Sequence, residues 1–383
     1  MARAPTLVWD ERFLDYDFGP AHPFTERSRG LAVELLDLWL AAHPDAAIDR
    51  IDRVPTAPRA DLESFHRADY LDFVEESGLR EFASLLDAGD TPAFPGCYEA
   101  AARIVGGALG AMRGVLEGNA PAFHPAGGLH HAHPARASGF CIFNDLAVAI
   151  AAALRDRRRV AYVDIDAHHG DGVMYGYYES ARVLAIDFHQ DGRTLFPGTG
   201  TPEETGRGDG AGTKVNLPLP PLAGDEALLP LFRRVAVPML TEFAPDVIVL
   251  QHGLDGHVGD PLARLQYSPA AYAEIARTVR ALADERCGGR LLVTGGGGYR
   301  PASVTRGLAT AGAIALGAPV PEATDELPDA WRHRFRAMFD TPAPRHWRDP
   351  ERFAPSPWRP DDAEHLVGLL ERALGRRFPA PAD

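Results

Sequence analysis

The stretch VAYVDIDAHHGDGVMYG, residues 160–176, begins as a buried strand and ends in acids and imidazoles. Residues 160–163 are apolar at consecutive positions, which is typical of a strand covered on both faces. Because strand side chains alternate, Asp164, Asp166 and His168 share one face if the strand continues. Asp166 and His168 could then reach a single ion, although a solvated strand end would have the same pattern.

The same kind of apolar run recurs along the chain and alternates with helical patterns. We expect strands at TLVW, RVAYVDID, RVLAIDFH, TKVNLPL, DVIVLQHG and RLLVTGGGG, and helices over residues 26–42, 97–117, 144–155, 225–243, 268–285 and 301–316. This alternation indicates an α/β fold with a mostly parallel sheet between layers of helices. Ligands of such sheets collect beyond the carboxyl ends of the strands, where the polar residues of this chain recur.

Composition limits the classes of partner. The 383 residues carry a formal net charge of -14, which argues against direct binding of nucleic acid or of an anionic membrane. No window approaches the ~20 apolar residues of a membrane-spanning helix, and the first residues lack a signal core. The three cysteines (Cys97, Cys141 and Cys287) are odd in number and far apart, so we expect no disulfide framework and a cytoplasmic location.

Three further segments end in residues that could carry chemistry. Asp255 follows the run VIVLQHG, His130 and His131 follow two glycines, and Tyr299 follows four. Each has an ordinary structural explanation on its own: a turn aspartate, a chance pair or a flexible loop. A phosphate-binding loop is excluded at GGGGYRP because it lacks the Gly-Lys-Ser/Thr ending.

Taken together, GGLHHAHPARASGFCIFND, YVDIDAHHGDGV, LFPGTG and GGGGY closely resemble the zinc-dependent histone deacetylases and their bacterial acetoin-utilization relatives. The resemblance extends from DFGPAHPFTERS through GGGGYRP and beyond. It implies a single three-layer α/β domain of the arginase/deacetylase type over residues 1–383. We expect its core at about 6–320, a helical extension at about 321–376 and a frayed tail at 377–383.

The resemblance implies a metal site. Asp166, His168 and Asp255 match the three ligands of the catalytic metal. Two carboxylates and one imidazole suit Zn²⁺ and leave room for water and a substrate carbonyl, and Fe²⁺ tolerates the same donors.

The resemblance also implies catalytic roles. His130 and His131 match the family's histidine pair, and Asp164 and Asp171 match the acids that hydrogen-bond to them, respectively. His131 is the better candidate for the general base, with His130 assisting electrostatically. Tyr299 matches the phenol that donates a hydrogen bond to the developing oxyanion.

Residues around the expected substrate path follow from the same resemblance. Phe140 and Phe196 match aromatic walls of a narrow tunnel, and Asp90 matches a rim acid that binds a peptide backbone. Gly139 and Arg27 match positions beside an internal acetate channel. Each has a plain alternative, such as core packing for the phenylalanines or a turn for Asp90.

A structural monovalent cation, normally potassium, is also implied. Asp164 and Asp187 are its candidate ligands here. Relatives usually have serine where Asp187 stands, so the extra carboxylate could strengthen cation binding or change which cation is bound.

These features predict a metal-dependent amidohydrolase that removes acetyl groups from lysine side chains of proteins and releases acetate. The alternative substrates are acetylpolyamines or other small acetylated amines.

An arginase-type ureohydrolase would use an Asp-Ala-His-x-Asp run and two metal ions. In this chain the run is DAHHGD, so the last aspartate comes one position later than in the arginase pattern. A binding module without activity would have lost a reactive position, and all of them are present. The oligomeric state is left open.

Overall fold

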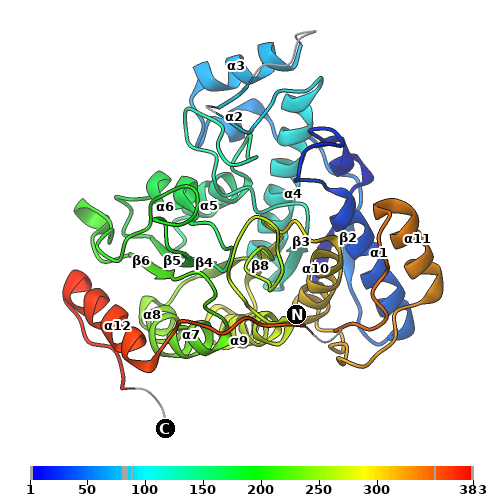
Figure 1. Ribbon diagram of the computed structural model, residues 1–383. Helices are drawn as coiled ribbons and strands as arrows, with labels where there is room; N and C mark the ends of the chain where they lie inside the picture. The colour runs from blue at the N-terminus through cyan, green and yellow to red at the C-terminus, as the bar shows by residue number, and fades with distance from the viewer. Residues whose placement is uncertain (1–2, 80–84, 88, 349–350, 381–383) are drawn as a thin grey trace.

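A single parallel sheet of eight strands organises the molecule (Figure 1). The computed structural model describes residues 3–79, 85–87, 89–348 and 351–380. In spatial order the strands run β2-β1-β3-β8-β7-β4-β5-β6, and every pairing is parallel. Their bounds are β1 Thr6–Val8, β2 Asp49–Ile51, β3 Ala122–His124, β4 Val160–Asp164, β5 Val183–Gln190, β6 Lys214–Leu219, β7 Val247–Gln251 and β8 Leu291–Thr294. The predicted α/β fold with a parallel sheet is confirmed.

Helices cover both faces of this sheet. Figure 1 shows α5 and α6 on one side and α7, α8 and α9 on the other, while α1 packs against α10. The helices are α1 Arg27–Ala42, α2 Arg59–Leu62, α3 Ala68–Gly78, α4 Cys97–Gly118, α5 Asp145–Arg155, α6 Asp171–Gly176, α7 Asp225–Leu231, α8 Val237–Phe243, α9 Pro269–Cys287, α10 Pro301–Leu316, α11 Asp329–Phe339 and α12 Pro360–Leu374. Strands β4, β5 and β7 are buried along their whole length, which explains their continuous apolar runs.

Local signals define the ends of the long helices. The side chain of Ser268 accepts a hydrogen bond from the backbone N–H of Ala271 and Pro269 follows it, while Gly288 ends α9 in the left-handed conformation. Asn144 caps α5 in the same way through Ala147. Such caps explain why the predicted bounds of these helices lie close to the observed ones.

The structure differs from expectation over residues 225–243. One continuous helix is predicted there, whereas the chain forms α7, a π-helical stretch at Phe232–Ala236 and then α8. Pro230 and Pro238 lie within this segment, and proline removes a helical N–H and crowds the preceding turn. The strands β2 and β3 were not predicted, because neither DRI nor AFH forms the continuous apolar run that marks the predicted strands.

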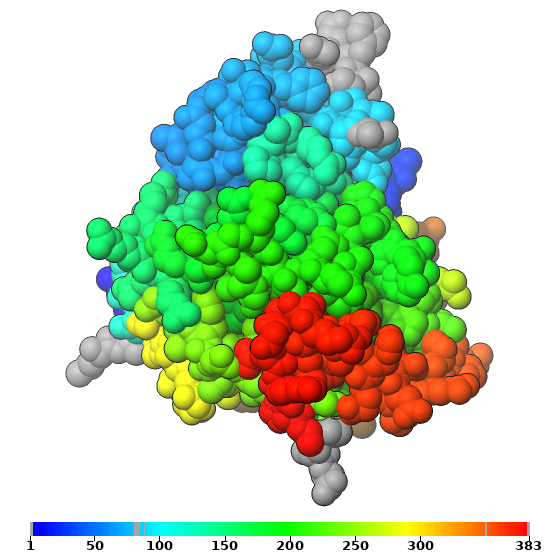
Figure 2. Space-filling model, turned by 90° about the vertical axis from the view of Figure 1, so that its left-hand side faces the viewer, coloured from blue at the N-terminus to red at the C-terminus, as the bar shows by residue number. Residues whose placement is uncertain are grey.

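The C-terminal segment packs on the outside of the domain. Figure 2 shows α12 lying against the surface formed by the middle of the chain. Arg234 forms an ion pair with Glu364 of α12, and the side chain of Gln266 donates to the carbonyl of Ala354 at 3.0 Å. Across the described residues, no helix combines the length and apolar character needed to cross a membrane.

The sheet order decides where the polar strand ends meet. The neighbouring strands β3, β8, β7, β4 and β5 precede the segments that carry the candidate residues. Because all strands run in one direction, these segments emerge at the same edge.

Candidate metal centre and active site

Three predicted ligands converge at the carboxyl edge of the sheet. One ligand atom from each of Asp166, His168 and Asp255 lies within 4.8 Å of the others, and all three residues are buried. His168 Nδ1 is 2.8 Å from Asp255 Oδ2 and 3.2 Å from Asp166 Oδ1. The first two residues follow β4 and the third follows its neighbour β7, so strand pairing brings together residues 87 to 89 positions apart.

Backbone groups hold the two carboxylates in place. The N–H of Gly297 and the side-chain amide of Gln251 donate to Asp166 Oδ2 at 2.7 and 2.9 Å. The N–H of Ala167 donates to Asp255 Oδ1 at 2.6 Å. These contacts orient the ligand oxygens before any ion binds.

Glycine is required where the backbone passes this cluster. A Cβ at Gly297 would lie 2.1 Å from Asp255 Oδ2, and one at Gly253 would lie 2.0 Å from Asp166 Oδ2. The glycine-rich loop after β8 therefore serves close approach to the carboxylates.

The donor set fits a divalent cation. Burial, together with the charge of Asp166, raises the pKa of Asp255 to about 7. Two carboxylates thus crowd each other in a buried space beside an imidazole nitrogen. A divalent ion offsets that repulsion and matches the oxygen and nitrogen donors.

A pair of histidines lies beside the triad. His130 Nδ1 is 2.8 Å from Asp164 Oδ2, and His131 Nδ1 is 2.7 Å from Asp171 Oδ1. The two Nε2 atoms are 3.0 Å apart. The structure therefore brings together each histidine and the acid with which the family resemblance paired it.

The two imidazoles have different electrostatic surroundings. Burial and the positive charge of His130 lower the pKa of His131 to about 4. Burial opposes protonation of His130 as well, but Asp164 and Asp166 raise its pKa to about 10. His131 is therefore neutral at neutral pH, which is the form that accepts a proton.

His133 belongs to this network and was missed from the sequence. Its Nε2 lies 2.9 Å from Asp171 Oδ2, so one carboxylate bridges two imidazoles. Although burial opposes ionisation, the hydrogen bonds of His131 and His133 hold the pKa of Asp171 well below its usual range. The alternation in HHAH, which places His131 and His133 two apart, was the available signal.

Aromatic side chains surround the approach to the cluster. The Phe196 ring lies 5.1 Å from that of His131, and the Phe140 ring lies 5.9 Å from that of Tyr299. Gly139 lies between these walls with φ of +53°, and an added Cβ would be 2.5 Å from the His131 ring. Gly139, His131 and Tyr299 line a small inner space beside the ligands Asp166 and His168, with a cavity volume of only about 20 Å³.

Tyr299 has a free hydroxyl at this site. Its backbone N–H donates to Asp260 Oδ2 at 2.8 Å, while its Oη has no hydrogen-bond partner among the described residues. Burial raises its pKa well above the usual value, so the phenol keeps its proton.

Asp90 is exposed near the Phe140 wall. Its carbonyl contacts His22 Nε2 at 3.1 Å, and the His22 ring lies 4.5 Å from that of Phe140. The hydroxyl of the next residue, Thr91, accepts from the N–H of Phe140 at 3.1 Å. Asp90 is thus placed at the edge of the aromatic approach.

Asp164 and Asp187, the candidate ligands of a structural cation, both lie beside Gly170. A Cβ there would be 2.6 Å from Asp164 Oδ2 and 3.1 Å from Asp187 Oδ2. The two oxygens of Asp187 already accept from His189 Nδ1 and from the N–H of Gly170, each at 2.7 Å. The carboxylate of Asp187 is therefore engaged by protein donors.

The placement of Arg27 does not fit an internal channel. Its side chain is 56% exposed and faces Asp17. Arg29 is instead buried and donates to the carbonyl of Gly296, beside the glycine-rich loop. The two arginines are two residues apart at the start of α1, so sequence alone could not choose the inward one.

Comparison with known proteins identifies the family. The model of the histone deacetylase domain matches residues 23–314. The chain belongs to the histone deacetylase family. Acetoin utilization protein AcuC of Bacillus subtilis (strain 168) is 35% identical over 97% of both chains, and that of Staphylococcus xylosus is 33% identical over 98% of both. A solved deacetylase-family structure, the HDA15 HD domain, superposes with a TM-score of 0.72 at 28% identity, covering 82% of this chain and 88% of the other.

Membership of the histone deacetylase family confirms the resemblance drawn from the four sequence stretches. It makes this chain a member of a deacetylase family, and the AcuC relatives match almost its whole length. The family match ends at residue 314, just before the end of α10.

Proposed function

We propose that this protein is a metal-dependent deacetylase that hydrolyses acetylated lysine side chains of proteins to acetate and free amine. The observation that carries the proposal is the juxtaposition of the Asp166, His168 and Asp255 triad with the His131–Asp171 pair. Ligands, base and orienting acid come from three segments of the chain, so their convergence is a property of the fold.

Zn²⁺ suits the donor set best, with Fe²⁺ as the alternative ion. Held by Asp166, His168 and Asp255, the ion would polarise the acetyl carbonyl and acidify the attacking water. The role of Asp164 and Asp187 in holding a potassium ion is part of the same proposal.

His131 is the proposed general base. Its Nδ1–H donates to Asp171, which leaves the lone pair on Nε2. In this proposal that nitrogen, which lies 3.0 Å from Nε2 of His130, takes a proton from the attacking water. The same nitrogen then delivers that proton to the departing amine as the C–N bond breaks. His130, paired with Asp164, stabilises the charge that develops beside it.

Tyr299 is the proposed oxyanion donor. Its protonated, unpartnered hydroxyl can donate a hydrogen bond to the carbonyl oxygen as that oxygen gains negative charge. Phe140, Phe196 and Gly139 would enclose the methylene chain of the substrate lysine, and Asp90 at the rim would accept N–H groups of its backbone.

A substrate panel tests this function. The purified protein is assayed with acetyl-lysine peptides, acetylpolyamines and other small acetylated amines, with and without chelator, and the substrates are ranked by kcat/KM. We expect acetyl-lysine peptides to rank first and chelation to abolish the activity. A preference for acetylpolyamines would mean that the substrates are small amines rather than proteins. Activity that resists chelation would overturn the proposed metal-dependent mechanism.

The identity of the ion needs its own measurement. Metal-free protein is reloaded with Zn²⁺ or, without oxygen, with Fe²⁺, and the metal content and activity are compared. One metal per chain is expected. Two per chain would favour ureohydrolase chemistry.

A further inference from the structure

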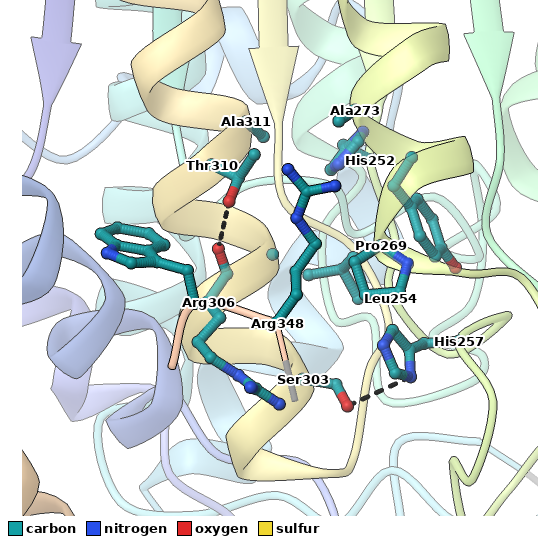
Figure 3. Close-up of a pocket in the computed structure, with 13 residues that line it drawn as sticks. His252, Leu254, His257, Pro269, Ala273, Ser303, Arg306, Thr310, Ala311 and Arg348 are labelled. Atoms are coloured by element: carbon teal, nitrogen blue, oxygen red, sulfur yellow. Dashed lines mark hydrogen bonds between the residues drawn. The ribbon is translucent and has the colours of Figure 1, made fainter. Parts of the chain in front are cut away.

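A second enclosed space lies against the loop that carries Asp255. While Asp255 joins the metal triad, His252, Leu254 and His257 of the same loop line this space (Figure 3). Helix α9 contributes Tyr272, helix α10 contributes Ser303 and Arg306, and the following segment contributes Arg348. The centre of a water molecule can occupy about 20 Å³ of this cavity. The cavity therefore has room for one or two atoms of the size of a water molecule.

Two buried polar side chains of this cavity lack partners. Nδ1 of His252 and the hydroxyl of Tyr272, in residues only 1% and 2% exposed, have no hydrogen-bond partner among the described residues. Buried polar groups in folded proteins almost always have a partner, which can be an ordered water or an ion. The space therefore fits an occupant that hydrogen-bonds to these groups.

The charge of the lining favours an anion. Arg348 extends between α10 and the His252 side of the cavity (Figure 3), and its guanidinium donates to the carbonyl of Pro321 at 3.2 Å. Arg306 is buried, donates to the carbonyl of Ala302 at 2.7 Å and lies 4.0 Å from Glu351. No aspartate or glutamate is among the described residues that line the cavity. Burial lowers the pKa of His252 to about 4, so at neutral pH its ring offers a neutral N–H.

We propose that this cavity binds one small monovalent anion of halide size and thereby stabilises the loop that carries Asp255. Residues of the loop, of α9 and of the segment at Arg348 line the same cavity, so an anion bound there would link all three. A neutral water would supply no negative charge to the guanidinium of Arg348, and the small cavity volume favours a single-atom anion over a larger oxyanion. The site is separate from the proposed reaction and does not depend on it.

Crystallography with bromide tests occupancy directly. Crystals of the full chain are soaked in sodium bromide, and diffraction is recorded at the bromine absorption edge. We expect an anomalous peak among His252, Tyr272 and Arg348. A peak of ordinary density without anomalous signal means water and overturns the proposal.

Thermal unfolding tests the energetic consequence in solution. Sodium chloride or sodium bromide replaces sodium gluconate at constant ionic strength. Saturable binding should raise the Tm of the protein by roughly 2–4 °C. The variant Arg348→Met should lose the saturable rise, whereas Arg193→Met, at a side chain 88% exposed, should keep it.

Two outcomes of the thermal experiment contradict the proposal. An equal halide response in Arg348→Met and the unmodified protein would mean that the anion binds elsewhere. A rise in Tm that depends on Arg348 and occurs with acetate but not with halides would mean that the cavity binds a carboxylate. It would overturn the proposal that the anion is of halide size. If Arg348→Met does not fold, the bromide peak in the unmodified protein decides the question.

Discussion

At the scale of single residues, the chemistry depends on which atom of each side chain its neighbours engage. Asp171 engages Nδ1 of His131 and Asp164 engages Nδ1 of His130, so the two Nε2 atoms lie 3.0 Å apart and face each other. The sequence motifs name these residues and their acids. They do not show that His133 shares Asp171, because that contact depends on how the chain turns after His131.

Replacing Tyr299 with phenylalanine should lower kcat far more than it changes KM. The hydroxyl is proposed to donate only to the developing oxyanion, and loss of one such donor costs about 2.7–4 kcal/mol, or ~10²–10³ in kcat. Steady-state kinetics on an acetyl-lysine peptide measures this. A variant with unchanged kcat would remove Tyr299 from the mechanism.

Replacing His133 should alter catalysis through Asp171. We expect His133→Phe to lower kcat by about tenfold, since loss of one hydrogen bond to a charged group costs about 1.5–3 kcal/mol and only part of it reaches His131. His133→Gln, which keeps an N–H donor, should retain most of the activity. The measurement is kcat and KM across a pH series for both variants, with folding checked by circular dichroism. Equal losses in both variants would mean that the hydrogen bond to Asp171 is irrelevant.

At the scale of secondary structure elements, strand order decides which motifs become neighbours. Strands β4 and β7 are adjacent although α6, β5, β6, α7 and α8 lie between them in sequence. Continuous apolar runs predicted both strands. The helices predicted at 144–155 and 268–285 begin at Asn144 and Ser268, which the structure shows to be their N-caps. The break at Pro230 and Pro238 was not anticipated, because a helical pattern of apolar residues continues through it.

Lys214 on β6 should make stability depend on pH. It is the only lysine of the chain and is fully buried, and burial lowers its pKa to about 7. Its ammonium group donates to the carbonyl of Val183 at 2.8 Å and to Thr213 Oγ1 at 2.6 Å. Between pH 7 and the pKa of the unfolded chain, near 10.4, the unfolded lysine is protonated and the folded one is not. The unfolded state therefore binds more protons, and the contribution of Lys214 to stability rises with pH.

The comparison with Lys214→Met isolates this effect. Relative to the variant, the free energy of unfolding of the unmodified protein should increase by at most about 1.4 kcal/mol per pH unit from pH 7 upward, and the difference should be constant below pH 7. Urea unfolding at pH 6, 7, 8 and 9 measures both proteins. Parallel pH profiles would show that the folded lysine is not perturbed.

At the scale of the whole molecule, the metal centre is a point at which distant parts of the chain are held together. Asp166 and Asp255 are both fully buried. Burial and the negative charge of Asp166 raise the pKa of Asp255. Without a cation, this repulsion opposes folding; with one, it is offset. Stability and metal content should therefore be coupled.

Chelation should lower the Tm of the whole domain, and one equivalent of Zn²⁺ should restore it. A ligand present at 1,000 times its Kd adds about 4.1 kcal/mol to the free energy of unfolding. Calorimetry of metal-free and reloaded protein measures the change. Asp255→Ala should abolish the response, while Asp209→Ala, at an exposed position, should retain it. A Tm independent of metal in the unmodified protein would contradict a buried metal site.

The sequence by itself determined the fold class and most strand and helix positions, and its resemblance to a known family predicted the residues of the metal and histidine motifs. The fold class and the elements follow from local causes, namely consecutive apolar residues and helix caps. Only the tertiary structure decided that Arg29 rather than Arg27 points inward, that His133 shares Asp171, and that His252 and Arg348 border one cavity. Such contacts depend on the order of the strands in the sheet and on the packing of the helices. The pattern of residues along a short stretch of sequence does not determine that order or that packing.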